Sequence, residues 1–84
     1  MLDYWITFRS VTFAQRAQRV VEGAGIRTHL ARAPKRLSER GCAYALLVGA
    51  QDAVRAVQEL RAASVPFRKA VRRTPSGDWE EASL

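Results

Sequence analysis

The stretch Cys42-Ala43-Tyr44-Ala45-Leu46-Leu47-Val48 is almost wholly apolar and lies between Gly41 and Gly49. A short apolar run between two glycines is typical of a strand that is buried on both faces, because a half-buried strand would alternate apolar and polar side chains. We therefore expect residues 42–48 to form a central strand of a sheet. The other elements are found by reading outward from it.

Downstream of this strand, the sequence predicts a helix and then a further strand. Asp52 lies in the expected first turn, where a carboxylate interacts favourably with the helix dipole. Apolar side chains recur at helical spacing after it, at Ala53, Val54, Val57, Leu60 and Ala63. Pro66 ends the helix. Residues 67–72 alternate weakly, and since three of these six residues are cationic we expect an edge strand.

Upstream, the pattern predicts a strand, a helix and a second strand. Residues 4–9 alternate Tyr4, Ile6 and Phe8 with Trp5, Thr7 and Arg9, the period of a strand with one face on a core. A helix follows, with Ser10 or Thr12 as its N-cap and Gly25 just past its end. From Ile26 the period returns to two, which predicts a strand over residues 26–31.

The resulting order is strand, helix, strand, strand, helix, strand. The two halves also resemble each other weakly, since Ala14, Arg16, Ala17 and Ala24 recur 39 positions later as Ala53, Arg55, Ala56 and Ala63. Two such units predict an α+β, ferredoxin-like βαββαβ sandwich with a four-stranded antiparallel sheet and both helices on one face. We expect a single domain over residues 1–73 and an acidic, flexible C-terminal tail over residues 74–84.

Composition sets the class of protein. The chain has 84 residues, 48% of them hydrophobic and 26% charged, which is typical of one small soluble domain. No run approaches the roughly 18 apolar residues of a membrane span, and the first residues lack the basic region of a signal peptide, so we expect a cytoplasmic protein without membrane contact. The net charge of +6 comes mostly from arginine, which suits an anionic partner, although a compositional bias would give the same excess.

Residues 35–44 are the candidate site. Cys42 is the only cysteine, which excludes an internal disulfide, a CxxC redox pair and a cysteine-rich zinc site. With His29 as the only histidine, we expect no metal and no cofactor. The neighbouring cations Lys35, Arg36 and Arg40 are of the kind that lowers the pKa of a thiol and makes it reactive. Cysteine is also among the most buried residue types, so an inert core residue is the competing interpretation.

A lone reactive cysteine suits some chemistries only. It can form a mixed disulfide, a persulfide or a selenium adduct, each of which needs one thiol. Hydrolytic catalysis would need a histidine, and a contact between Cys42 and His29 stays open because their strands are consecutive.

Two further functions remain as alternatives. An RNA-binding module of the same strand order would use Trp5 and Tyr44 as an aromatic platform, but residues 42–48 lack the pattern of that module, so we do not expect nucleic acid. A non-catalytic binding or dimerisation module would use the same two side chains as interface anchors, with a homodimer as one expected state.

Four motifs resemble those of the selenium/sulfur carrier protein-like family. They are Tyr4-x-Ile6-Thr7-Phe8-x-Ser10, Glu22-Gly23-Ala24-Gly25-Ile26, Pro34-Lys35-Arg36-Leu37-Ser38 and Gly41-Cys42-Ala43-Tyr44-Ala45-Leu46. The resemblance covers about residues 4–72, although the family usually has glycine where this chain has Ala43.

The resemblance implies a function for the candidate site. It implies that Cys42 is the carrier residue of a carrier protein rather than of an enzyme with turnover. The binding or activating residues would then be Arg36, Ser38, Arg40, Gly41 and Tyr44. The partners would be proteins that donate sulfur or selenium and proteins that accept it.

Overall fold

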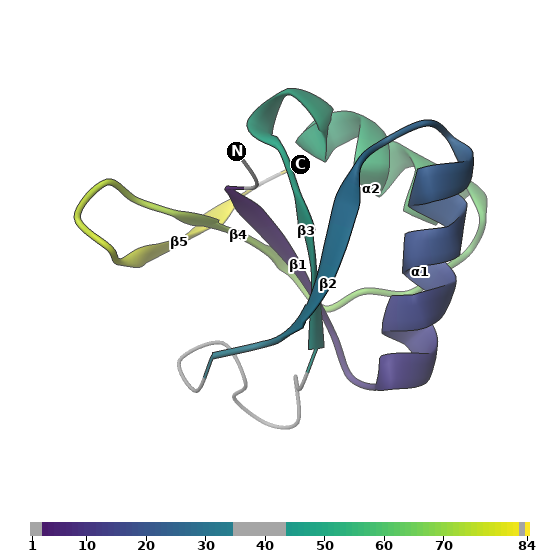
Figure 1. Ribbon diagram of the computed structural model, residues 1–84, viewed down its shortest axis with the longest axis horizontal. Coiled ribbons are helices and arrows are strands. Elements are labelled where there is room, and N and C mark those ends of the chain that lie inside the picture. The colour runs from purple at the N-terminus through teal and green to yellow at the C-terminus, as the bar shows by residue number, and fades with distance from the viewer. Residues whose placement is uncertain (1–2, 35–43, 83) are drawn as a thin grey trace.

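The computed structural model describes residues 3–34, 44–82 and 84. In chain order the elements are β1 (Tyr4–Phe8), α1 (Val11–Gly23), β2 (Thr28–Arg32), β3 (Tyr44–Val48), a 3₁₀ turn (Ala50–Asp52), α2 (Ala53–Ala62), β4 (Ala70–Arg73) and β5 (Trp79–Ala82). The described strands form one antiparallel sheet in the order β2-β3-β1-β4-β5 (Figure 1). The described part of the chain is therefore of the α+β class, with a five-stranded sheet and two α-helices.

Strand β3 lies between β2 and β1, as its apolar sequence predicts. Ala45, Leu46 and Val48 are buried on it, on both faces of the sheet. The expected strand over residues 42–48 is described from Tyr44 onward, and residues 42 and 43 lie outside the described part of the chain.

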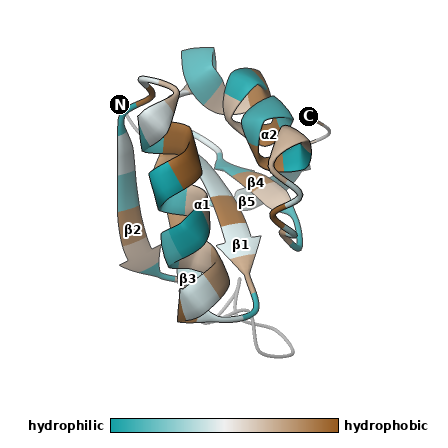
Figure 2. Ribbon diagram, turned by 90° about the vertical axis from the view of Figure 1, so that its right-hand side faces the viewer, coloured by the Kyte–Doolittle hydropathy of each residue, from teal (hydrophilic) through white to brown (hydrophobic). Residues whose placement is uncertain are grey.

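Both helices cover the same face of the sheet and lie side by side on it (Figures 1 and 2). Their buried side chains recur three and four residues apart, as an amphipathic helix requires: Ala14, Ala17 and Val21 on α1, and Ala53, Ala56, Val57 and Leu60 on α2. They pack against Ile6, Phe8, Leu46 and Val48 of the sheet. The core thus lies in one layer between the helices and the sheet.

The ends of α1 follow from local chemistry. Ser10 is the N-cap, and its hydroxyl accepts a hydrogen bond from the N–H of Phe13 at 3.3 Å. At the other end, Gly25 has a φ of +84°, which lets its N–H and that of Ile26 donate to the last carbonyls of the helix, those of Glu22 and Val21.

The expectation of a four-stranded sheet was wrong, because residues 79–82 form β5 within the segment expected to be a tail. A turn over residues 74–78 brings β5 against β4, with Gly77 at a φ of +89°. Arg72 pairs with Glu80 at 3.4 Å, and the guanidinium carbon of Arg73 lies 5.5 Å from the centre of the Trp79 ring. Opposite charges and an aromatic contact across the pair thus favour β5.

Strand β4 also differs from the expected edge strand over residues 67–72. It lies between β1 and β5, and it begins only at Ala70. The strand begins at this later residue because its pairing with β1 contains a bulge. The N–H of Thr7 donates to the carbonyl of Lys69 at 2.8 Å, and the carbonyl of Thr7 accepts from the N–H of Arg68 at 2.8 Å, so two residues oppose one.

The register separates two aromatic side chains that we expected to share a face. Trp5 is paired with Leu47 and Tyr44 is paired with Phe8, so Trp5 and Tyr44 lie on opposite faces of the sheet. Tyr44 packs against the core between sheet and helices, whereas Trp5 contacts Trp79 on the other face. The expected joint platform or interface of Trp5 and Tyr44 was therefore wrong.

Candidate functional site

Most of the expected site lies outside the described residues. This applies to Lys35, Arg36, Ser38, Arg40, Gly41 and Cys42. Tyr44 is the one member of the expected set that the structure describes, at the start of β3. The roles assigned to the other residues therefore stay predictions.

Tyr44 lies in a row that crosses three strands. It is paired with Phe8 on β1 and with Arg32 on β2. The guanidinium carbon of Arg32 lies 6.0 Å from the centre of the Tyr44 ring, within the range of a cation–π contact. Tyr44 is half-buried against the core, so its ring is held in place and anchors the first residue of β3.

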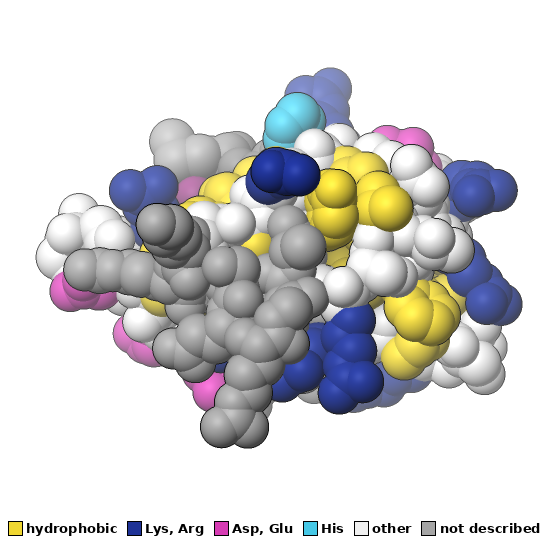
Figure 3. Space-filling model, turned by 90° about the horizontal axis from the view of Figure 1, so that it is seen from below, with side chains coloured by type: hydrophobic (Ala, Val, Ile, Leu, Met, Phe, Trp, Pro, Cys, Tyr) yellow, Lys and Arg dark blue, Asp and Glu magenta, His cyan; other side chains and the backbone are white. Residues whose placement is uncertain are grey.

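Three arginines lie at this same end of the sheet. Arg32 ends β2, Arg9 directly follows β1, and Arg68 is bonded through its backbone to Thr7 near the end of β1. In the view onto this end, Lys and Arg side chains gather beside hydrophobic ones (Figure 3). The described residues thus give this end of the molecule a positive character, which suits an anionic partner.

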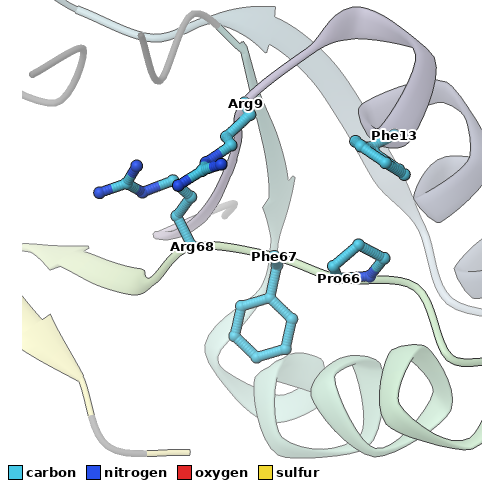
Figure 4. Close-up of a pocket in the computed structure, with 5 residues that line it drawn as sticks. All are labelled: Arg9, Phe13, Pro66, Phe67 and Arg68. Carbon is cyan, nitrogen blue, oxygen red and sulfur yellow. The ribbon is translucent and has the colours of Figure 1, made fainter. Parts of the chain in front are cut away.

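A pocket of about 460 Å³ opens at this end. It is lined by Arg9, Phe13, Pro66, Phe67 and Arg68 (Figure 4). These residues come from two segments, the junction of β1 with α1 and the connection from α2 to β4. The volume is within the range of small-molecule sites, roughly 300 to 1,000 Å³.

The two segments are fixed to each other by Thr7, which is fully buried. Its hydroxyl donates to the carbonyl of Lys69 at 3.1 Å and accepts from the N–H of Lys69 at 3.3 Å. Together with the two backbone bonds of the bulge, these contacts set where Arg68 lies relative to Arg9. Hydrogen bonds at Thr7 therefore join the two segments that line the pocket.

His29 is exposed on β2 and is paired with Leu47, three residues along the strand from Arg32. It lies on the face of the sheet that carries Trp5, because both residues pair with Leu47. A contact between His29 and Cys42 stays untested, since Cys42 is outside the described residues.

Within the described part of the chain, no three His, Cys, Asp or Glu side chains gather as they would around a metal ion. Nor does any helix of that part combine the length and the apolar character needed to cross a bilayer.

The sequence pattern predicted a site in residues 35–44, and it did not indicate that Arg9 and Arg68 line a pocket. Each was interpreted as part of an alternating strand pattern. The sequence signal for a shared pocket was weak, because Arg9 and Arg68 are far apart in the sequence and come together only through the bulge at Thr7. Arg9 follows an apolar strand and precedes a helix cap, which is the only local hint of a site at that position.

Comparison with known proteins identifies one family. The family described as "Putative Se/S carrier protein-like" matches residues 3–72, which is most of the chain and includes its single cysteine. No curated protein and no solved structure matches the chain.

Proposed function

The chain belongs to the Se/S carrier protein-like family, and on this basis we propose that it carries sulfur or selenium as a covalent adduct on Cys42. The match includes Cys42, and the chain has no other cysteine. A carrier that holds a chalcogen atom through a thiol has only this residue to use. The family match and the single thiol are the observations that carry the proposal.

The transfer is an exchange between sulfur atoms and needs no external oxidant. The thiolate of Cys42 attacks the terminal sulfur of a persulfide on the donor protein. A new S–S bond forms at Cys42 as the S–S bond of the donor breaks, and the donor leaves as a thiolate. Delivery to an acceptor thiolate is the same step in reverse. With selenium, the terminal atom is selenium and the bonds that form and break are S–Se bonds.

The charge around the site supports this chemistry. Lys35, Arg36 and Arg40 precede Cys42 in the sequence, and cations near a thiol favour the reactive thiolate. Tyr44 follows Cys42 by two residues and begins β3 at the end of the sheet where Arg9 and Arg68 lie. We propose that this basic end attracts acidic faces of the donor and acceptor proteins.

A free thiol that must stay reduced suits a reducing compartment, so we propose that the protein is located in the cytoplasm.

We also infer that β1 to β4 form a ferredoxin-like unit to which β5 has been added. The support is the order β2-β3-β1-β4, antiparallel throughout, with both helices on one face.

The test is a loading experiment followed by intact-protein mass spectrometry without reductant. The wild type and Cys42→Ser are each incubated with a cysteine desulfurase and cysteine, and in parallel with selenocysteine. The proposal expects one added sulfur or selenium atom in the wild type and none in Cys42→Ser. His29→Ala is the matched control, and it is expected to load as the wild type does, since the transfer needs no histidine. Loading of Cys42→Ser to the same extent would contradict the proposal.

A further inference from the structure

The pocket at the β1–α1 junction has a cationic side and an apolar side. The guanidinium groups of Arg9 and Arg68 lie together on one side of it, and Phe13 and Pro66 lie on the other (Figure 4). Phe13 is 37% exposed, and of the large hydrophobic residues in the described chain only Val54 is exposed with it. An exposed aromatic ring beside a pocket is available to a ligand.

The two arginines have no carboxylate partner within residues 3–34 and 44–82 or at residue 84. Their neighbouring positions are imposed by the fold, because Arg68 donates its backbone N–H to the carbonyl of Thr7, two residues before Arg9. Two positive charges held close together repel each other, and an anion between them removes the repulsion. The planar fork of each guanidinium also matches the oxygen atoms of a phosphate group.

We propose that this pocket binds a phosphate monoester whose organic part is flat and apolar. The phosphate lies between the guanidinium groups of Arg9 and Arg68, and the organic part lies against Phe13 and Pro66. A dianionic phosphate balances the two arginine charges, which a single carboxylate does not. The site does not include Cys42, and none of its residues takes part in the thiol chemistry. Arg9 and Arg68 also belong to the basic end that we propose attracts the partner proteins.

Phenyl phosphate is the probe, and its binding is followed by titration of the ¹⁵N-labelled protein with amide NMR and by calorimetry. We expect saturable binding, with the largest shifts at the amides of residues 9–13 and 67–69. The double variant Arg9→Gln/Arg68→Gln is expected to weaken binding at least about fivefold, since exposed charged hydrogen bonds are each of modest strength. Its matched control is Arg19→Gln/Arg27→Gln, which removes the same charge from exposed positions that do not line the pocket, and which is expected to bind as the wild type does.

A second variant tests the apolar side. Phe13→Ser is expected to weaken phenyl phosphate and to leave the weaker binding of inorganic phosphate unchanged. Equal weakening by the two double variants would show nonspecific attraction by net charge and would overturn the proposal, as would the absence of saturable binding. Cys42→Ser is expected to bind phenyl phosphate normally, so a failure of this site and a failure of the carrier function are distinguishable.

Discussion

The hydroxyl of Thr7 exchanges two hydrogen bonds with the backbone of Lys69, donating to its carbonyl at 3.1 Å and accepting from its N–H at 3.3 Å. The bulge opposite Thr7 takes the Lys69 N–H out of the regular pairing between β1 and β4, and the hydroxyl replaces the missing acceptor. Thr7 is also the one buried polar side chain among the described residues. The two hydrogen bonds to Lys69 therefore explain why β1 has a buried polar residue at Thr7.

Replacing Thr7 by valine keeps the shape of the side chain and removes both bonds. We expect the free energy of unfolding to fall by about 1 to 2 kcal/mol, because the Lys69 N–H loses its acceptor in a part-buried place. Thr7→Ser keeps the hydroxyl and is the control, with a smaller loss that comes from the missing methyl group. Urea denaturation measures the free energy of unfolding of both variants. Equal stability of Thr7→Val and the wild type would show that the two bonds contribute nothing.

Two glycines at the end of α1 give opposite predictions. Gly25 has a φ of +84°, where an alanine is strained, so Gly25→Ala should destabilise the protein by about 1 kcal/mol. Gly23 ends the helix, and a Cβ added there would meet nothing within 4 Å. Gly23→Ala should raise the stability by about 0.5 kcal/mol, since alanine favours the helix. Thermal unfolding followed by circular dichroism compares the two, and a shift of the same sign in both variants would contradict this account of the helix end.

Trp79 makes two aromatic contacts that hold strand β5 against the sheet. Its ring lies edge-on to that of Trp5, with centres 5.0 Å apart, and under the guanidinium of Arg73. Trp79→Ala should cost about 1 to 2 kcal/mol of stability. It should also shift the fluorescence of Trp5, then the only tryptophan, to longer wavelength as the ring becomes solvated. Trp79→Phe keeps an aromatic contact and should give smaller changes.

The ion pair of Arg72 with Glu80 serves as the comparison for Trp79. Its side chains are 43% and 61% exposed, so water and salt screen their attraction. Glu80→Gln should change the stability by less than about 0.5 kcal/mol. If this variant lost as much stability as Trp79→Ala, charge rather than the aromatic contact would hold β5.

The sequence predicted the helices and the presence of the first four strands because their signals are local, although it placed β4 too early and at an edge of the sheet. The spacing of Ala14, Ala17 and Val21 marks a helix face, and the apolar run that includes Leu46 and Val48 marks a buried strand. Strand β5 was missed because Glu80 and Glu81 are poor strand formers in isolation. Its signal is pairwise, since the two arginines that end β4 and these two glutamates lie on either side of one turn.

The pocket could not be predicted from the sequence for a related reason. Arg9 and Arg68 are brought together by the bulge opposite Thr7, and a bulge depends on the pairing of two strands rather than on either strand alone. The aromatic residues show the same limit. Trp5 and Tyr44 were each correctly placed on a strand, but the register decides which face a side chain takes, and a register is a property of the pair.

The measurement that tests the carrier function most directly is the intact mass of one loaded sample before and after treatment with excess thiol. A persulfide adds one sulfur atom to Cys42, and a sulfinic acid adds two oxygen atoms, which have nearly the same mass. A thiol removes the outer sulfur of a persulfide but does not reduce a sulfinic acid. We expect a gain of one sulfur atom on loading and a full return to the starting mass after the thiol is added. A mass gain that persists, or one that also occurs in Cys42→Ser, would contradict it.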